Sequence, residues 1–162
     1  MSVNRKRPHV LVLPEDDANR QLANGFHLDL GQHISARQFQ VLVEAGGWMK
    51  VLKEFLETHV AAMERNPYRH MILLIDLDNR EQRLRCAKDQ VPGHLTDRVF
   101  ILSSLSKPEA LRADLGPYYE AVGLAMARDC WEETNTIWGH PLRHNSSELD
   151  RLRITVRPIL FP

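Results

Sequence analysis

Residues 70–79, HMILLIDLDN, constrain the fold of this chain more than any other stretch. Residues 71–75 form an unbroken apolar run, which is typical of a strand that is buried on both faces of a parallel sheet. The run ends in Asp76, Leu77 and Asp78, so a buried strand delivers two carboxylates, two residues apart, to its carboxyl end. Because parallel strands need crossover connections, the rest of the sequence should alternate strands with helices.

The expected alternation is present along the sequence. The clearest helix is 48–64, whose apolar residues recur at the helical period of 3.6 residues. Strands are expected at 9–13, 39–45, 70–76 and 98–104, and helices at 18–30, 48–64, 80–88, 107–115, 117–130 and 146–156. The predicted fold class is therefore α/β, with a mainly parallel four-stranded sheet in three layers and helices on both faces.

Length and composition limit the class of protein. The 162 residues are enough for one domain with a substantial core, and we expect a single domain over 1–162 with 131–162 as a C-terminal helical extension. No stretch approaches the roughly 20 apolar residues that span a bilayer, and the apolar run near the N-terminus is too short for a signal peptide. The two cysteines do not suggest a disulfide framework. These features predict a cytoplasmic protein with no membrane partner.

Carboxylates follow the first and the third predicted strand. The first strand is followed by Glu15, Asp16 and Asp17, and the third ends in Asp76 and Asp78. Because ligand sites of parallel sheets lie outside the carboxyl ends of the strands, these acids are expected to converge on one crevice. Like charges at short distance repel unless a cation neutralises them, and Mg²⁺ prefers oxygen ligands. The pattern predicts a Mg²⁺ or Mn²⁺ site, where the metal would polarise a phosphodiester and activate water.

In these residues the sequence resembles the Toprim domain, which is shared by topoisomerases, bacterial primases and nucleases of the overcoming-lysogenization-defect type. The family pattern is a Glu after the first strand and Asp-x-Asp after the third, and Glu15 in LVLPEDD and Asp76 and Asp78 in LLIDLDN match it. The family usually has Gly directly after the Glu, where this chain has Asp16. The resemblance covers residues 8–130 and implies Mg²⁺-dependent cleavage or joining of DNA or RNA strands, with the three matching acids as catalytic residues.

The resemblance also implies further ligands and partners. Asp17 and Glu109 are additional candidate metal ligands, because the family places a second acid soon after the Glu and the nucleases place one after the fourth strand. Arg80, Arg83 and Lys107 are the candidates for holding a phosphate backbone. The net charge is zero, whereas autonomous nucleic-acid binders are usually basic, which favours a partner. In the resembling nucleases that partner is an ATPase, often in anti-phage defence. No P-loop motif is present here, so we expect a separate ATPase subunit.

A second interpretation is a receiver domain of two-component signalling, which also places acids after the first strand. In that interpretation Asp16 and Asp17 bind Mg²⁺, Asp76 is phosphorylated, and Ser103 or Ser104 is the switch residue. A receiver also needs a lysine at the end of a fifth strand, and the last third of this sequence contains no lysine. The chain would therefore be a degenerate receiver.

A third interpretation is a non-catalytic partner subunit whose acids only cap helices. Asp78 with Glu81 matches a capping box for the helix that follows, Glu109 fits the same pattern in the next helix, and Asp16 or Asp17 is suited to cap the first helix. The three interpretations make different predictions for the carboxyl ends of the first and third strands.

Histidine and cysteine residues suggest a different metal. Cys130, His140 and His144 are possible zinc ligands, but a fourth ligand is not identifiable and the spacing matches no standard zinc finger. Their role is left open. His59 lies on the apolar face of the helix 48–64 and is expected to be a core residue.

Overall fold

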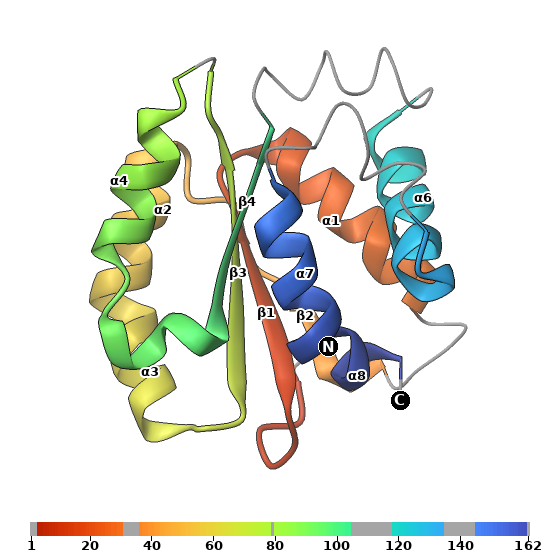
Figure 1. Cartoon of the computed structure of the whole chain (residues 1–162), viewed down its shortest axis with the longest axis horizontal. Coiled ribbons are helices and arrows are strands. Elements are labelled where there is room, and N and C mark those ends of the chain that lie inside the picture. The colour runs from red at the N-terminus through yellow and green to blue at the C-terminus, as the bar shows by residue number, and fades with distance from the viewer. Residues whose placement is uncertain (1–2, 31–35, 79, 105–117, 135–144, 162) are drawn as a thin grey trace.

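The computed structural model describes residues 3–30, 36–78, 80–104, 118–134 and 145–161. A four-stranded sheet with the order β2-β1-β3-β4 lies between two layers of helices (Figure 1). All three strand pairings are parallel, so the predicted α/β fold class is confirmed. The strands are β1 (His9–Pro14), β2 (Phe39–Val41), β3 (Arg69–Asp76) and β4 (Val99–Ser104).

Helices cover both faces of the sheet (Figure 1). One face packs against α1 (Asp17–Leu30), α6 (Tyr119–Glu132), α7 (Ser146–Thr155) and α8 (Arg157–Leu160). The other packs against α2 (Trp48–Glu54), the π-helical segment η2 (Phe55–His59), α3 (Val60–Arg65) and α4 (Gln82–Gln90). The 3₁₀ segments η1 (Ala36–Gln38) and η3 (Gly93–Arg98) precede β2 and β4. No helix among the described residues is long and apolar enough to cross a membrane.

Strand β3 shows why the sheet needs both layers. Its side chains alternate between the faces, so Ile72 and Leu74 join the core under α1 and α6, while Met71, Leu73 and Ile75 join the core under α2 and α4. Every residue from His70 to Asp76 is buried. The prediction of a strand that is buried on both faces is confirmed.

Several predicted boundaries differ from those of the structure. The second strand, expected over 39–45, pairs as a strand only over Phe39–Val41. The helix expected over 48–64 contains one π turn, Phe55–His59, and His59 is buried within it as expected. The last predicted helix, 146–156, corresponds to α7, which ends at Thr155. A short helix, α8, then begins at Arg157 and holds Pro158 in its first turn, where a missing N–H breaks no helical bond. The helix expected over 107–115 lies outside the described residues.

The segment 42–47 continues beside β1 in an irregular form. The N–H of Leu42 donates to the carbonyl of Val12, and the N–H groups of Gly46 and Gly47 both donate to the main-chain carbonyl of Glu15. Both glycines have positive φ, 94° and 150°, which side chains with a Cβ rarely adopt. This turn brings the N-terminus of α2 to the end of β1.

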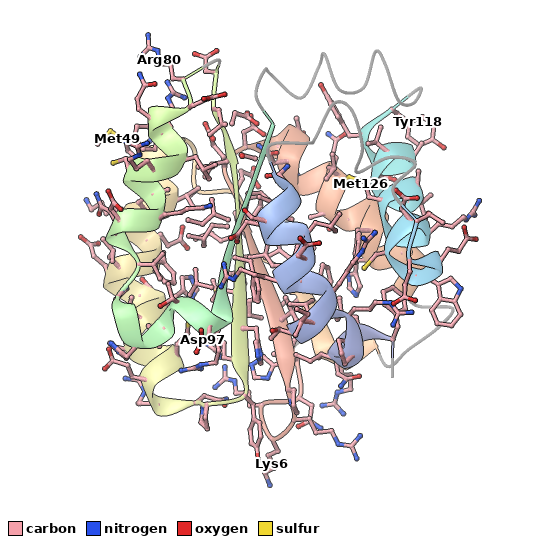
Figure 2. All side chains as sticks on the ribbon, viewed as in Figure 1. Lys6, Met49, Arg80, Asp97, Tyr118 and Met126 are labelled. Carbon is pink, nitrogen blue, oxygen red and sulfur yellow. The ribbon has the colours of Figure 1, made fainter. Side chains whose placement is uncertain are left out.

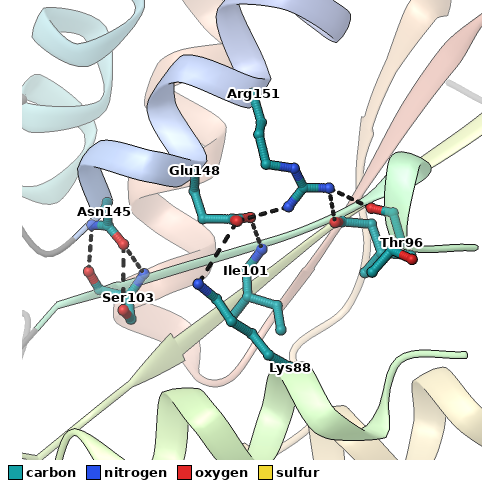
Figure 3. A network of polar contacts seen from close by, with 8 residues as sticks. Lys88, Thr96, Ile101, Ser103, Asn145, Glu148 and Arg151 are labelled. Atoms are coloured by element: carbon teal, nitrogen blue, oxygen red, sulfur yellow. Dashed lines mark hydrogen bonds and ion pairs between the residues drawn. The ribbon is translucent and has the colours of Figure 1, made fainter. Parts of the chain in front are cut away.

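Strand β4 is an edge of the sheet, and side chains of α7 cover it in place of a neighbouring strand (Figure 3). The Asn145 side chain accepts a hydrogen bond from the N–H of Ser103 at 3.0 Å and donates one to the carbonyl of the same residue at 2.6 Å. A fifth strand would supply the same two partners, a carbonyl and an N–H, from two different peptide groups. The edge of β4 is therefore satisfied at this position without another strand.

The next turn of α7 continues this side-chain ladder. Oε2 of Glu148 accepts a hydrogen bond from the N–H of Ile101 at 3.0 Å, and Nη2 of Arg151 donates to the carbonyl of Val99 at 3.1 Å. Glu148 and Arg151 also pair with each other at 2.7 Å, although Glu148 is only 4% exposed. α7 also packs apolar side chains against the sheet, in the core that it shares with α1 and α6.

Candidate functional site

The candidate site lies at the carboxyl ends of β1 and β3. These two strands are neighbours, but β1 continues into α1 on one face of the sheet, while the chain from β3 enters α4 on the other face. This divergence is the topological switch point, where ligands of open parallel sheets bind. The sequence predicted this location from the acids at the two strand ends.

Glu15 joins the two strand ends. Its Oε2 accepts a hydrogen bond from the main-chain N–H of Asp76 at 2.6 Å, across 61 residues of sequence. Burial raises the pKa of the Glu15 carboxyl, and the neighbouring charge of Asp16 raises it further. The same pKa is lowered by the N–H of Asp76, the Arg83 guanidinium and the N–H of Trp48. Glu15 is thus a half-buried carboxylate next to the Asp-x-Asp motif.

Asp76 and Asp16 are bridged by an amide that sequence reasoning missed. Nδ2 of Asn19 donates to Oδ1 of Asp76 at 3.2 Å and to Oδ1 of Asp16 at 3.1 Å. Asp16 also accepts the main-chain N–H of Asn19 at 2.9 Å, which is the N-cap arrangement of α1, so the predicted cap is Asp16. Asn19 and Asp76 are both buried. An asparagine three residues after an N-cap aspartate, beside a strand end, was the available sequence signal.

Asp17 forms its hydrogen bonds within α1, away from Glu15 and Asp76. Its two carboxylate oxygens accept hydrogen bonds from Arg20 at 2.5 Å and from Gln21 at 2.6 Å, on the exposed side of α1. The Arg20 bond and then the Gln21 bond lower the pKa of this carboxyl. Arg20 in turn contacts Glu44 at 3.2 Å. The structure therefore places Asp17 in a surface network rather than with Glu15 and Asp76.

Asp78 lies in an exposed turn after β3, and its predicted capping role is wrong. Its φ is +50°, and the N–H of Arg80 bonds to the carbonyl of Leu77 at 2.8 Å, so a turn separates the strand from the helix. Helix α4 begins only at Gln82, preceded by Glu81, without a side-chain cap. The capping box fails because its spacing requires the helix to begin directly after Asp78.

Arg83 is held against the site. Its Nη1 donates to the main-chain carbonyl of Asp76 at 3.3 Å, and its Nη2 lies 3.8 Å from Oδ2 of Asp78. The guanidinium also lies over the Trp48 ring, 5.2 Å from the ring centroid. Arg80, the other predicted phosphate contact from the segment 80–88, precedes α4 and is exposed at the end of the molecule (Figure 2). The structure thus brings a cation of α4 to the Asp-x-Asp motif.

Other candidate ligands lie away from the site or outside the described residues. Lys107 and Glu109, and likewise His140 and His144, are outside the described residues. Cys130 is buried in α6, and burial raises the pKa of its thiol to about 11, which keeps it protonated at neutral pH. Within the described ranges, no group of three or more His, Cys, Asp or Glu side chains is close enough to hold a metal ion.

No protein-family model, curated protein or solved structure matches this chain. The fold and the site define an α/β protein with an all-parallel sheet and a carboxylate-rich switch point.

The raised pKa of Glu15 gives a testable pH dependence. A glutamate whose folded pKa is above the ordinary value of 4.5 contributes stability that is present below that value and is lost as the pH rises through the folded pKa. The amide that Glu15→Gln introduces is neutral at every pH. The melting temperature of the variant minus that of wild type should therefore become more positive from about pH 4 to about pH 7. Thermal unfolding across this range measures the difference.

Asp17→Asn is the matched control, because its pKa shift has the opposite sign. A lowered carboxyl pKa contributes stability above the ordinary value of 3.8, which is lost as the pH falls through the folded pKa. Asp17→Asn should therefore be less stable than wild type at about pH 7 and approach it in acid. Parallel curves for the two variants would contradict the assignment of Glu15 as a carboxyl destabilised by burial.

Proposed function

We propose that the chain is a Toprim-like subunit that cleaves nucleic-acid phosphodiesters with Mg²⁺ or Mn²⁺. The observation that carries the proposal is the contact between Glu15 and the main chain of Asp76 at 2.6 Å. It puts the acid after the first strand beside the Asp-x-Asp after the third, which is the pairing that the resemblance implies.

The residues at the site are compatible with a divalent cation. Glu15, Asp76 and Asp78 would hold it. Burial, and then the charge of Asp16, raises the pKa of Glu15, and a bound cation would favour its charged form. Mg²⁺ often uses one or two carboxylates and keeps its waters, so it does not need a preformed cage of three side chains. When bound, the metal polarises the phosphodiester and activates water.

The chain's own residues would bind and orient the substrate. Arg83 is fixed by Asp76 and Trp48, so its guanidinium is preorganised to contact a phosphate next to the Asp-x-Asp motif. The exposed Arg80 would contact the backbone further out. Asn19 orients the Asp76 carboxylate through its amide.

Asp78→Asn tests this proposal. Asn is among the residues that best tolerate positive φ, so the variant should fold as wild type does. An amide is a poor Mg²⁺ ligand, and loss of metal assistance worth several kcal/mol should reduce nicking of DNA or RNA by roughly a hundredfold or more. Plasmid nicking and Mn²⁺ calorimetry are the measurements. Asp89→Asn, an exposed aspartate of α4, is the control and should keep full activity. Nicking that survives Asp78→Asn would overturn the proposal.

The receiver interpretation remains a second candidate because of one observation. Asp16 and Asp76 are bridged by the Asn19 amide, as would suit a metal-binding acid beside a phosphoacceptor. In the described part of the chain, however, α7 covers the edge of β4 where a fifth strand with its lysine would lie. Beryllofluoride with Mg²⁺ should therefore not be taken up at Asp76. Stoichiometric uptake would favour the receiver over the nuclease.

The proposed partners follow from the same function. They are DNA or RNA as substrate and an ATPase subunit as protein partner, as the Toprim resemblance implies. A cytoplasmic location and a role in anti-phage defence belong to this proposal as well.

A further inference from the structure

A cluster of cations lies at the amino end of the sheet, opposite the carboxylates. We name it the amino-end patch, and it consists of Arg5, Lys6, Arg65 and Arg69 together with the exposed ring of Tyr68. Figure 2 shows Lys6 and Arg80 at opposite ends of the molecule. Strand β3, with eight residues at roughly 3.3 Å each, separates the two ends by about 26 Å. The patch is therefore distinct from the switch-point site.

Hydrogen bonds hold the segments of the patch together. Nδ2 of Asn66 donates to the main-chain carbonyl of Arg5 at 3.1 Å, which joins the turn before β1 to the turn before β3. The guanidinium of Arg98 donates to the carbonyls of Asn66 and Arg69, each at 3.0 Å, and to that of Met63 at 3.2 Å. The cations thus project from a fixed backbone rather than from independent loops.

The charges of the patch are not compensated within the described part of the chain. None of its four cations forms an ion pair with a described carboxylate. The nearby Glu64 pairs with His94 instead, at 3.3 Å. Burial, followed by the charges of Arg5 and Arg65, lowers the pKa of Arg69, as expected for cations that repel one another. A chain of zero net charge therefore concentrates positive charge at one end.

We infer that the amino-end patch binds the phosphate backbone of a single-stranded nucleic acid, with a base stacked on Tyr68. Arginine predominates in the patch, and its planar guanidinium matches phosphate geometry. Tyr68 is 46% exposed and directly precedes Arg69 in the turn that carries the patch. Backbone charge beside an aromatic platform is the combination that sequence-tolerant single-strand binding uses. An anionic membrane is the poorer fit, because interfacial binding needs an apolar face and Tyr68 is the one exposed ring among the residues that define the patch.

This inference rests on the proposed function in one respect: the proposed function suggests that the bound polymer is a nucleic acid. Binding at the amino-end patch needs neither the metal nor the carboxylates of the switch point. A strand held there would be anchored about 26 Å from the proposed cleavage site, so the patch would retain the polymer rather than take part in the chemistry.

Fluorescence anisotropy with a labelled single-stranded oligonucleotide, in a chelator and at several salt concentrations, tests the inference. Four phosphate contacts predict a slope of log K against log salt of about −3 for wild type. Arg5→Gln combined with Arg65→Gln should make that slope shallower by about 1.4 and weaken binding roughly 25-fold at about 0.1 M salt. Lys53→Gln with Arg128→Gln removes the same charge from exposed positions of α2 and α6 and should change neither value.

Tyr68→Ala separates stacking from charge. It should weaken single-strand binding about tenfold while leaving the salt slope and the weaker binding of duplex unchanged. The absence of oligonucleotide binding at about 50 mM salt would overturn the inference, as would equal losses in the patch and control variants. Binding of anionic vesicles without oligonucleotide binding would also overturn it. If the protein nicks nucleic acid but does not bind the oligonucleotide in a chelator, only this inference fails. If it binds the oligonucleotide but does not nick, only the proposed nuclease function fails.

Discussion

Glu148→Ala is expected to lower the free energy of unfolding by about 2–3 kcal/mol. The Glu148 carboxylate is 4% exposed, pairs with Arg151 at 2.7 Å and accepts the N–H of Ile101 at 3.0 Å. Alanine leaves that N–H buried without its acceptor and removes the anion beside the Arg151 guanidinium. The first loss occurs where water cannot replace the missing partner, whereas the Arg151 side chain is 37% exposed and regains part of its solvation. Urea-induced unfolding followed by circular dichroism measures the change.

Two other variants identify the source of this loss. Glu148→Gln keeps an oxygen for the N–H of Ile101 but not the charge, so its loss should be intermediate. Asp150→Ala, at an exposed position of the same helix, should change stability by less than about 0.5 kcal/mol. If Glu148→Ala costs no more than Asp150→Ala, the side-chain ladder on β4 does not stabilise the protein.

Gly123→Ala is expected to destabilise the protein by about 3 kcal/mol or to prevent folding. Helices α1 and α6 touch through their backbones, and a Cβ on Gly123 would lie 2.0 Å from the carbonyl oxygen of Leu22 and 2.8 Å from the nitrogen of Phe26. Backbone atoms cannot rotate away as a side chain does, so α6 would have to move off α1. Thermal and urea unfolding would both report the loss.

The other glycines provide the controls for this prediction. A Cβ on Gly93 meets nothing within 4 Å, and Gly93→Ala should be neutral or stabilising by about 0.4–1 kcal/mol. A Cβ on Gly25 would lie 2.1 Å from the carbonyl oxygen of Glu120 in the same helix contact, so Gly25→Ala combined with Gly123→Ala should cost less than the sum of the two. A Gly123→Ala protein as stable as wild type would contradict the close backbone contact.

The fold was predictable because its strongest signals are local. The apolar run at 71–75 needs cover on both faces, and that requirement alone implies a parallel sheet between two helical layers. The alternation of strands and helices supplied the elements, and the rule that sites lie at carboxyl strand ends placed Glu15 near Asp76.

What could not be predicted depends on contacts between distant residues. Asn19 meets Asp76 across 57 residues, and nothing in the helix that contains Asn19 specifies this contact. Arg83 was expected to contact phosphate, but its packing over the Trp48 ring was not predictable. The position of Trp48 follows from the turn at Gly46 and Gly47. The capping role assigned to Asp78 failed for a local reason, since a left-handed turn and a helix start have similar sequence signals.

The side-chain ladder on β4 has a consequence for the order in which the chain emerges from the ribosome. Residues 99–104 are synthesised more than 40 residues before Asn145, whose amide bonds to Ser103. Until α7 arrives, β4 presents open N–H and carbonyl groups to any other nascent strand, and such edges are templates for association. The nascent chain therefore passes through a stage of greatest aggregation risk between the completion of β4 and the docking of α7. Slow translation over that interval would lower the yield of native protein without altering its final stability.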